Sequence, residues 1–118
     1  MSTIFERCGG FATVRRIVSD FYERVLASEN LQGYFAGIDM PRLVDHQTKF
    51  MTAIMGGPAK FTDQQLERAH ARLGVRAGDY AELVALLVET LEEHGLPAED
   101  VRTVEAALEA RRTLIVAR

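Results

Sequence analysis

The 118-residue sequence lacks the features that several common classes of protein require. It has one cysteine, Cys8, which excludes an internal disulfide and a thiolate zinc site. No apolar run approaches the roughly 18 residues that cross a membrane, and the first residues lack the apolar segment of a signal peptide. We therefore expect a cytoplasmic protein that makes no membrane contact.

A basic excess and the usual catalytic motifs are also missing. Lys and Arg number 14 against 17 Asp and Glu, a net charge of −3, which argues against a nucleic-acid partner. There is no GxSxG nucleophile motif, and Gly56-Gly57-Pro58 lacks the Lys-Ser/Thr of a phosphate-binding loop. With 47% apolar and 26% charged residues, the composition is that of a soluble globular protein. We expect residues 1–118 to form one monomeric domain.

Apolar residues recur at helical spacing over most of the chain. The stripes run from Val14 to Leu26, from Leu43 to Ile54, from Leu66 to Leu73, from Tyr80 to Leu91 and from Val101 to Ile115. Pro41 and Gly95 stand where a helix begins and ends, and no segment alternates with a period of two. The Gly9-Gly10 pair predicts a tight turn before the first long helix. The sequence thus predicts an all-α domain.

A few polar residues lie on or beside stripes that should face the core. Tyr22 lies within the stripe from Val14 to Leu26, and Gln47 lies within the stripe from Leu43 to Ile54, which His46 borders. His70 lies within the short stripe from Leu66 to Leu73. Taken singly, each has an ordinary structural explanation: a core ring with its hydroxyl at the surface, a stripe edge, a surface imidazole or a hydrogen-bonded core imidazole. Because a buried polar group without a partner costs about 1–3 kcal/mol, together they indicate one shared polar pocket. His94 is interpreted as a cation at a helix C-terminus.

Among the chemistries open to such a pocket, haem fits best. Zinc needs three or four protein ligands, which this set does not supply. Haem iron needs one imidazole nitrogen, with hydrogen-bond donors on its other face and apolar walls around the macrocycle. Aromatic and aliphatic side chains are available for these walls: Phe21, Phe35, Phe50, Phe61, Leu66 and Leu73.

The sequence also resembles a known family, the truncated haemoglobins of the first group, over nearly its whole length. The matching segments occur in family order: Phe5-Glu6, Gly9-Gly10, 20–26 (DFYERVL), Tyr34-Phe35, Asp39-Met40, His46-Gln47, Phe50, Gly56-Gly57-Pro58, Ala69-His70 and Gly74. The resemblance implies a two-over-two helical sandwich that holds one b-type haem.

By position in that family, His70 matches the proximal iron ligand. Tyr22 matches the distal tyrosine that hydrogen-bonds the iron ligand, and Gln47 matches the glutamine that supports it. Leu43 matches an apolar distal residue, and Phe35 matches the aromatic ring that packs on the haem plane. The resemblance therefore implies a hydrogen-bonding distal pocket at this haem.

Other positions are less closely defined by the resemblance. In some cyanobacterial members a histidine at the position of His46 binds the iron; the alternative here is a surface histidine beside Asp45. The covalent haem linkage of those proteins uses a C-terminal histidine, and none follows His94, so we expect a non-covalent haem. Basic residues near the haem edge are candidate propionate partners: Lys49, Lys60, Arg68 and Arg72.

The resemblance implies a protein that binds dioxygen, nitric oxide and carbon monoxide. The first alternative is an enzyme, a nitric oxide dioxygenase, which would need a reductase as electron donor. The second is a haem-based sensor module, and the third a haem-free helical interaction module. The sequence alone does not separate the first of these from simple gas binding, because both use the same haem site.

Overall fold

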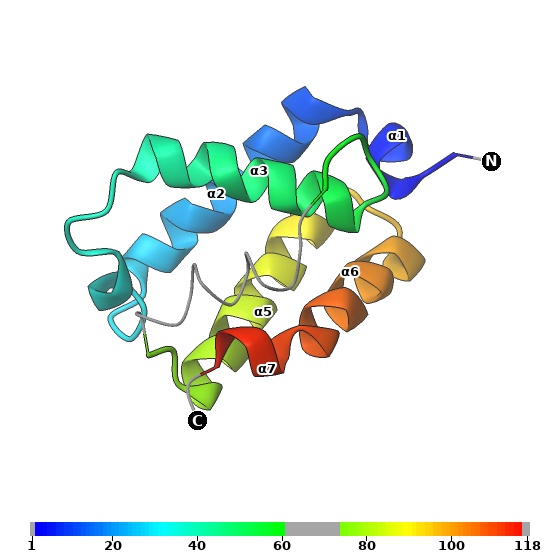
Figure 1. The fold of residues 1–118 in the computed structure, drawn as a ribbon. Coiled ribbons are helices and arrows are strands. Elements are labelled where there is room, and N and C mark those ends of the chain that lie inside the picture. Colours follow the sequence, from blue (N-terminus) through cyan, green and yellow to red (C-terminus); the bar gives the residue numbers. More distant parts are fainter. Residues whose placement is uncertain (1, 61–73, 117–118) are drawn as a thin grey trace.

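The computed structural model describes residues 2–60 and 74–116, and within these ranges it consists of helices and their connections (Figure 1). The helices are α1 (Ile4–Cys8), α2 (Phe11–Ala27), the 3-10 helix η1 (Gln32–Phe35), α3 (Met40–Ile54), α5 (Ala77–Glu93), α6 (Ala98–Ala110) and α7 (Arg112–Ile115). The described ranges contain no strand, only an isolated parallel bridge between Val75 and Val116. The prediction of an all-α fold is therefore confirmed. The helix expected around 66–73 lies outside the described residues.

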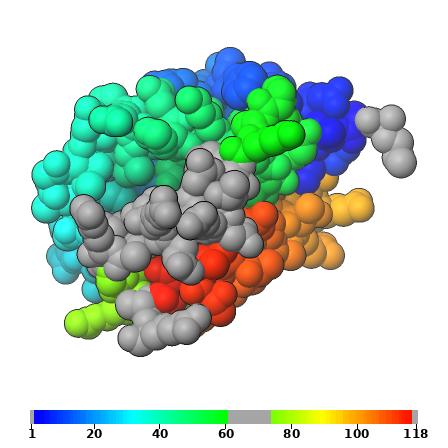
Figure 2. Space-filling view, in the orientation of Figure 1, coloured from blue at the N-terminus to red at the C-terminus, as the bar shows by residue number. Residues whose placement is uncertain are grey.

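The long helices form two pairs. Helix α2 packs against α3, α5 packs against α6, and α2 also contacts α5, which joins the pairs (Figure 1). On the face shown in Figure 2, α3 occupies the upper part, while α6 and α7 lie toward the lower right. This is the predicted two-over-two arrangement.

Local sequence determines how the N-terminal helices begin. Thr3 and Glu6 form a capping box at the start of α1. Gly9 and Gly10 have φ angles of +118° and +81°, a region open to glycine, and they form the predicted turn into α2. The Asp39 side chain accepts a hydrogen bond from the Arg42 backbone N–H and so caps α3.

The core is built from the apolar stripes of the long helices. Val14, Ile17 and Val25 of α2, Leu91 of α5 and Val104 of α6 have no exposed surface. Each such side chain contributes about 1.5–3 kcal/mol through burial. The helix pairs are therefore held together mainly by apolar packing.

Two details differ from the sequence prediction. The last helix was expected to continue to Ile115, but α6 ends at Ala110, and the chain turns at Arg111 before the short α7. This turn brings Ile115 into the core and Val116 to its bridge with Val75. His94 ends α5, as expected, but its Nε2 lies 2.6 Å from Oδ2 of Asp20, so it also links α5 to α2.

None of the helices in the described part of the chain is both long enough and apolar enough to span a membrane.

Candidate functional site

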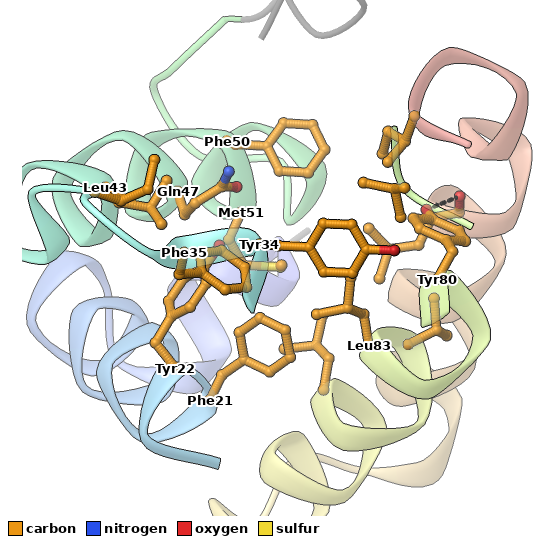
Figure 3. A pocket seen from close by; sticks show the side chains of 16 residues that line it. Phe21, Tyr22, Tyr34, Phe35, Leu43, Gln47, Phe50, Met51, Tyr80 and Leu83 are labelled. Carbon is orange, nitrogen blue, oxygen red and sulfur yellow. Dashed lines mark hydrogen bonds between the residues drawn. The ribbon is translucent and has the colours of Figure 1, made fainter. Parts of the chain in front are cut away.

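A partly open cavity of about 220 Å³ lies between α2, η1, α3 and α5 (Figure 3). Six of the residues predicted for the site line it: Phe21, Tyr22, Phe35, Leu43, Gln47 and Phe50. Further lining residues come from α5, α6 and the segment around α7, among them Tyr80, Leu83, Leu108 and Ile115. The structure thus brings predicted residues from three separate elements to one cavity.

Tyr22 presents its hydroxyl to this cavity. Its side chain is 8% exposed, and its ring packs edge-on against Phe21 and Phe35, with centroids 4.9 and 5.6 Å away. The hydroxyl makes no hydrogen bond with another described residue, and burial raises the pKa of Tyr22 well above its ordinary value. The group therefore stays protonated and free to donate a hydrogen bond to a molecule in the cavity.

Helix α3 supplies the facing wall. Leu43, Gln47 and Phe50 are spaced four and three residues apart, so they lie on the same side of the helix. Figure 3 shows the Gln47 amide directed into the site among apolar neighbours, on the side where Tyr22 lies. The Gln47 amide has both a donor and an acceptor. The wall that includes Tyr22 and Gln47, called the distal wall below, therefore offers two polar groups in otherwise apolar surroundings.

Two more tyrosines line the cavity, and the sequence analysis did not select either as a site residue. The Tyr34 hydroxyl donates a hydrogen bond to Oδ2 of Asp79 (2.5 Å) and accepts one from the Arg76 backbone N–H (3.2 Å). The bond to Asp79 raises the pKa of Tyr34. The Tyr80 hydroxyl donates to the Leu108 carbonyl at 2.6 Å (dashed in Figure 3), and burial raises the pKa of Tyr80 to about 12.

The signals for these two residues in the sequence were weak. Tyr34 appeared only beside Phe35 in a matching segment, and Tyr80 only as the first member of an apolar stripe. Their hydroxyl partners lie 45 and 28 residues further along the chain. Local periodicity does not report contacts over such separations.

His46 and Lys49 lie outside the cavity. Both are exposed, and neither is among the residues that line it. Lys49 lies instead at a surface hollow between α2 and α3, with Phe11, Arg15 and Asp45. At about 100° per residue, Lys49 follows Gln47 by some 200° and so faces away from the stripe that includes Gln47. In this structure Lys49 is therefore not placed to reach a group in the cavity.

Lys60 is exposed and does not line the cavity. The remaining predicted residues lie outside the described residues: Phe61, Leu66, Arg68, His70, Arg72 and Leu73. His70, the expected proximal ligand of the haem iron, is one of them.

The described lining fits a haem. Aromatic and aliphatic side chains make up most of the wall, as a flat apolar macrocycle requires. The Gln47 amide and the Tyr22 hydroxyl, which has no partner among the described residues, provide hydrogen bonding on one side. Ligand pockets usually measure about 300–1,000 Å³, and this cavity measures about 220 Å³. A bound haem would therefore fill the cavity and extend through its open side.

Comparison with known proteins agrees with this geometry. The sequence model of the bacterial-like globin family matches residues 3–116. A group 1 truncated haemoglobin of Mycolicibacterium paratuberculosis is 33% identical over 107 residues, 91% of this chain and 79% of that protein. The group 1 truncated haemoglobin of a Synechocystis species is 34% identical over 110 residues, 90% of this chain and 89% of that protein.

A solved structure is similar over its whole length. The 2/2 haemoglobin of a Synechococcus species, determined in its cyanomet state with covalently attached haem, has a TM-score of 0.90 and 28% identity. The alignment covers 99% of this chain and all of that one. The fold and the sequence thus agree with the same family.

Proposed function

Because this chain belongs to the bacterial-like globin family, we propose that it holds a b-type haem non-covalently in the cavity between α2, η1, α3 and α5. The family supports haem-based gas binding. The finer proposal is that dioxygen, nitric oxide and carbon monoxide bind reversibly at the haem iron. In this proposal Tyr22 and Gln47 select among these gases by hydrogen bonding.

The Tyr22 hydroxyl is the observation that carries the proposal. Tyr22 is a buried residue that borders the cavity, and its protonated hydroxyl has no partner among the described residues. A ligand in the cavity can accept a hydrogen bond from this hydroxyl, and a hydrogen bond to a charged group contributes about 1.5–3 kcal/mol. The site is therefore suited to a small ligand that carries partial negative charge.

When bound, the haem would supply an iron that coordinates the gas, with His70 as the proposed ligand from the protein. Tyr22 would donate a hydrogen bond from its hydroxyl to the gas. Gln47 would donate a second hydrogen bond, or accept one from Tyr22 and fix the direction of that hydroxyl. Leu43 and Phe50 would keep water out, which strengthens both hydrogen bonds because the local dielectric constant is low.

The proposal has two forms, which differ at His46. In one form His46 also binds the iron and competes with every external gas. In the other, the iron is open on the side of Tyr22. The exposed position of His46, away from the cavity, favours the open form.

Absorption spectra of the purified protein test the proposal. Spectra are recorded for the ferric protein, after reduction with dithionite and after addition of carbon monoxide, with haem added where uptake is incomplete. We expect a Soret band, a broad high-spin ferrous spectrum and a sharp carbon monoxide spectrum. Sharp, split visible bands in the gas-free ferrous protein would support the form in which His46 binds.

Two histidine variants locate the ligand from the protein. His70→Ala should lose stable haem in the ferrous state, because the proposed iron ligand is gone. His94→Ala is the matched control, since His94 pairs with Asp20 and does not line the cavity. Failure of the parent protein to take up haem would refute the proposed function, and a normal spectrum for His70→Ala would refute the ligand assignment.

A further inference from the structure

All three tyrosines of the chain line the cavity, but their hydroxyl groups have different hydrogen-bond partners. Tyr22 has none among the described residues, and Tyr80 donates to a backbone carbonyl. Tyr34 alone donates to a carboxylate, that of Asp79. Of these two acceptors, only the carboxylate is basic enough to take a proton from the phenol.

The environment of Tyr34 suits loss of an electron together with a proton. A phenol that loses one electron becomes a strong acid, so its proton must leave at the same time. Asp79 Oδ2 lies 2.5 Å from the Tyr34 oxygen and accepts its hydrogen bond. The Arg76 backbone N–H, at 3.2 Å, can still donate to that oxygen after the proton has moved. The oxygen therefore keeps a hydrogen bond in both states.

We propose that Tyr34 is a one-electron donor within the cavity, used when a hydroperoxide oxidises the bound haem, and that Asp79 receives its proton. This inference rests on the proposed haem binding. A hydroperoxide takes up two electrons and two protons as its O–O bond breaks, yielding an alcohol and water, or two waters from hydrogen peroxide. The two protons come from solvent. Tyr34 supplies one of the two electrons and becomes a neutral phenoxyl radical, while its proton passes to Asp79, which becomes a neutral carboxylic acid. The second electron follows by the same route after an external reductant has restored Tyr34.

The location of Tyr34 suits both the transfer of its electron to a bound group and its later reduction by an external molecule. Its ring borders the cavity, so the electron does not have to pass through another residue to reach a group bound there (Figure 3). Tyr34 and Asp79 are also partly exposed, whereas Tyr22 and Tyr80 are buried. A small external reductant can therefore approach Tyr34 and restore it, while Asp79 exchanges its proton with solvent. The protein would then consume hydroperoxides at the expense of that reductant.

Radical trapping on the haem-loaded protein tests the proposal. Ferric protein is mixed with one equivalent of hydrogen peroxide and frozen for electron paramagnetic resonance, and a parallel sample receives a nitroso spin trap before digestion with trypsin. Trypsin places the three tyrosines on separate peptides: Tyr22 on 17–24, Tyr34 on 25–42 and Tyr80 on 77–102. Mass spectrometry of the trapped adduct therefore identifies the oxidised tyrosine directly in the parent protein.

We expect a phenoxyl signal and an adduct on peptide 25–42. Tyr34→Phe should lose both, and Asp79→Asn should greatly reduce both, because an amide accepts the hydrogen bond but not the proton. Tyr80→Phe removes the same atom from another wall of the cavity and should keep both. An adduct mainly on peptide 17–24 or 77–102, or an unchanged signal in Tyr34→Phe, would overturn the proposal.

The carbon monoxide spectrum of the same samples separates the two levels of inference. Protein that binds haem and carbon monoxide normally but forms no radical at Tyr34 would refute only this proposal. Protein that takes up no haem would refute the proposed function and this inference together. If Tyr34→Phe does not fold, the adduct position in the parent protein still decides the outcome.

Discussion

Replacing Tyr22 with phenylalanine removes one hydroxyl from the cavity and keeps the ring that packs against Phe21 and Phe35. If this hydroxyl donates to the bound gas, its loss should accelerate the release of dioxygen. A hydrogen bond to a charged group contributes about 1.5–3 kcal/mol. At about 1.4 kcal/mol per factor of ten, dioxygen should leave roughly 10- to 150-fold faster.

Carbon monoxide distinguishes hydrogen bonding from a change of shape. This gas develops little charge when it binds, so Tyr22→Phe should alter its release far less than that of dioxygen. Stopped-flow displacement measures both rates: dioxygen is displaced by carbon monoxide, and carbon monoxide by nitric oxide. The gas-free variant should unfold with a free energy no lower than that of the parent, because the hydroxyl it loses makes no described hydrogen bond.

Tyr80→Phe is the matched control for these rates. It removes the same atom from another wall of the same cavity, where the hydroxyl is already bonded to Leu108. Its dioxygen release should stay close to that of the parent. Equal acceleration of both gases in Tyr22→Phe would show a steric effect and refute the reasoning, as would a dioxygen rate that does not change.

Four further outcomes follow from the described residues. Tyr80→Phe should lower the free energy of unfolding by about 0.5–1.5 kcal/mol in urea, because it removes one hydrogen bond to the Leu108 carbonyl, which keeps the bond from the Arg111 backbone N–H. Since burial raises the pKa of Tyr80 from 10.0 to about 12, the unfolded chain loses this proton first, so stability should fall as the pH rises from 10 toward 12, and less steeply in Tyr80→Phe. Gly57→Ala should lower the melting temperature, at a cost of about 1–3 kcal/mol, because its Cβ would lie 2.6 Å from the Phe5 ring; Gly78→Ala, which meets nothing within 4 Å, should not. His46→Leu should leave the gas-free ferrous spectrum unchanged, because His46 is exposed and outside the cavity; a change from low spin to high spin would show that it binds the iron.

Much of the distal wall could be predicted from the sequence because it depends on helical spacing. Tyr22 and Gln47 were selected as polar residues on apolar stripes, and both line the cavity. A stripe must face the interior, and a polar residue on it must then lie near other buried groups. The same reasoning predicted the long helices and the turn at Gly9-Gly10.

Residues beside a stripe were harder to place. Lys49 and His46 lie close to the site in sequence, yet both are exposed on α3 and do not line the cavity. A difference of one or two residues along a helix changes the direction of a side chain by 100–200°. Proximity in sequence to Gln47 therefore does not place His46 or Lys49 on the cavity wall.

The sequence by itself determined the helices, their apolar faces and the family, because these depend on neighbouring residues and on motifs in order. Tertiary structure alone decided which hydroxyl has which partner. Tyr34 bonds to Asp79 across 45 residues, and His94 pairs with Asp20 across 74. Such pairs arise when packing of the apolar faces fixes the relative position of two helices, and no local pattern records that position. This is why Tyr34 bonds to a carboxylate while the Tyr22 hydroxyl has no partner in the described part of the chain.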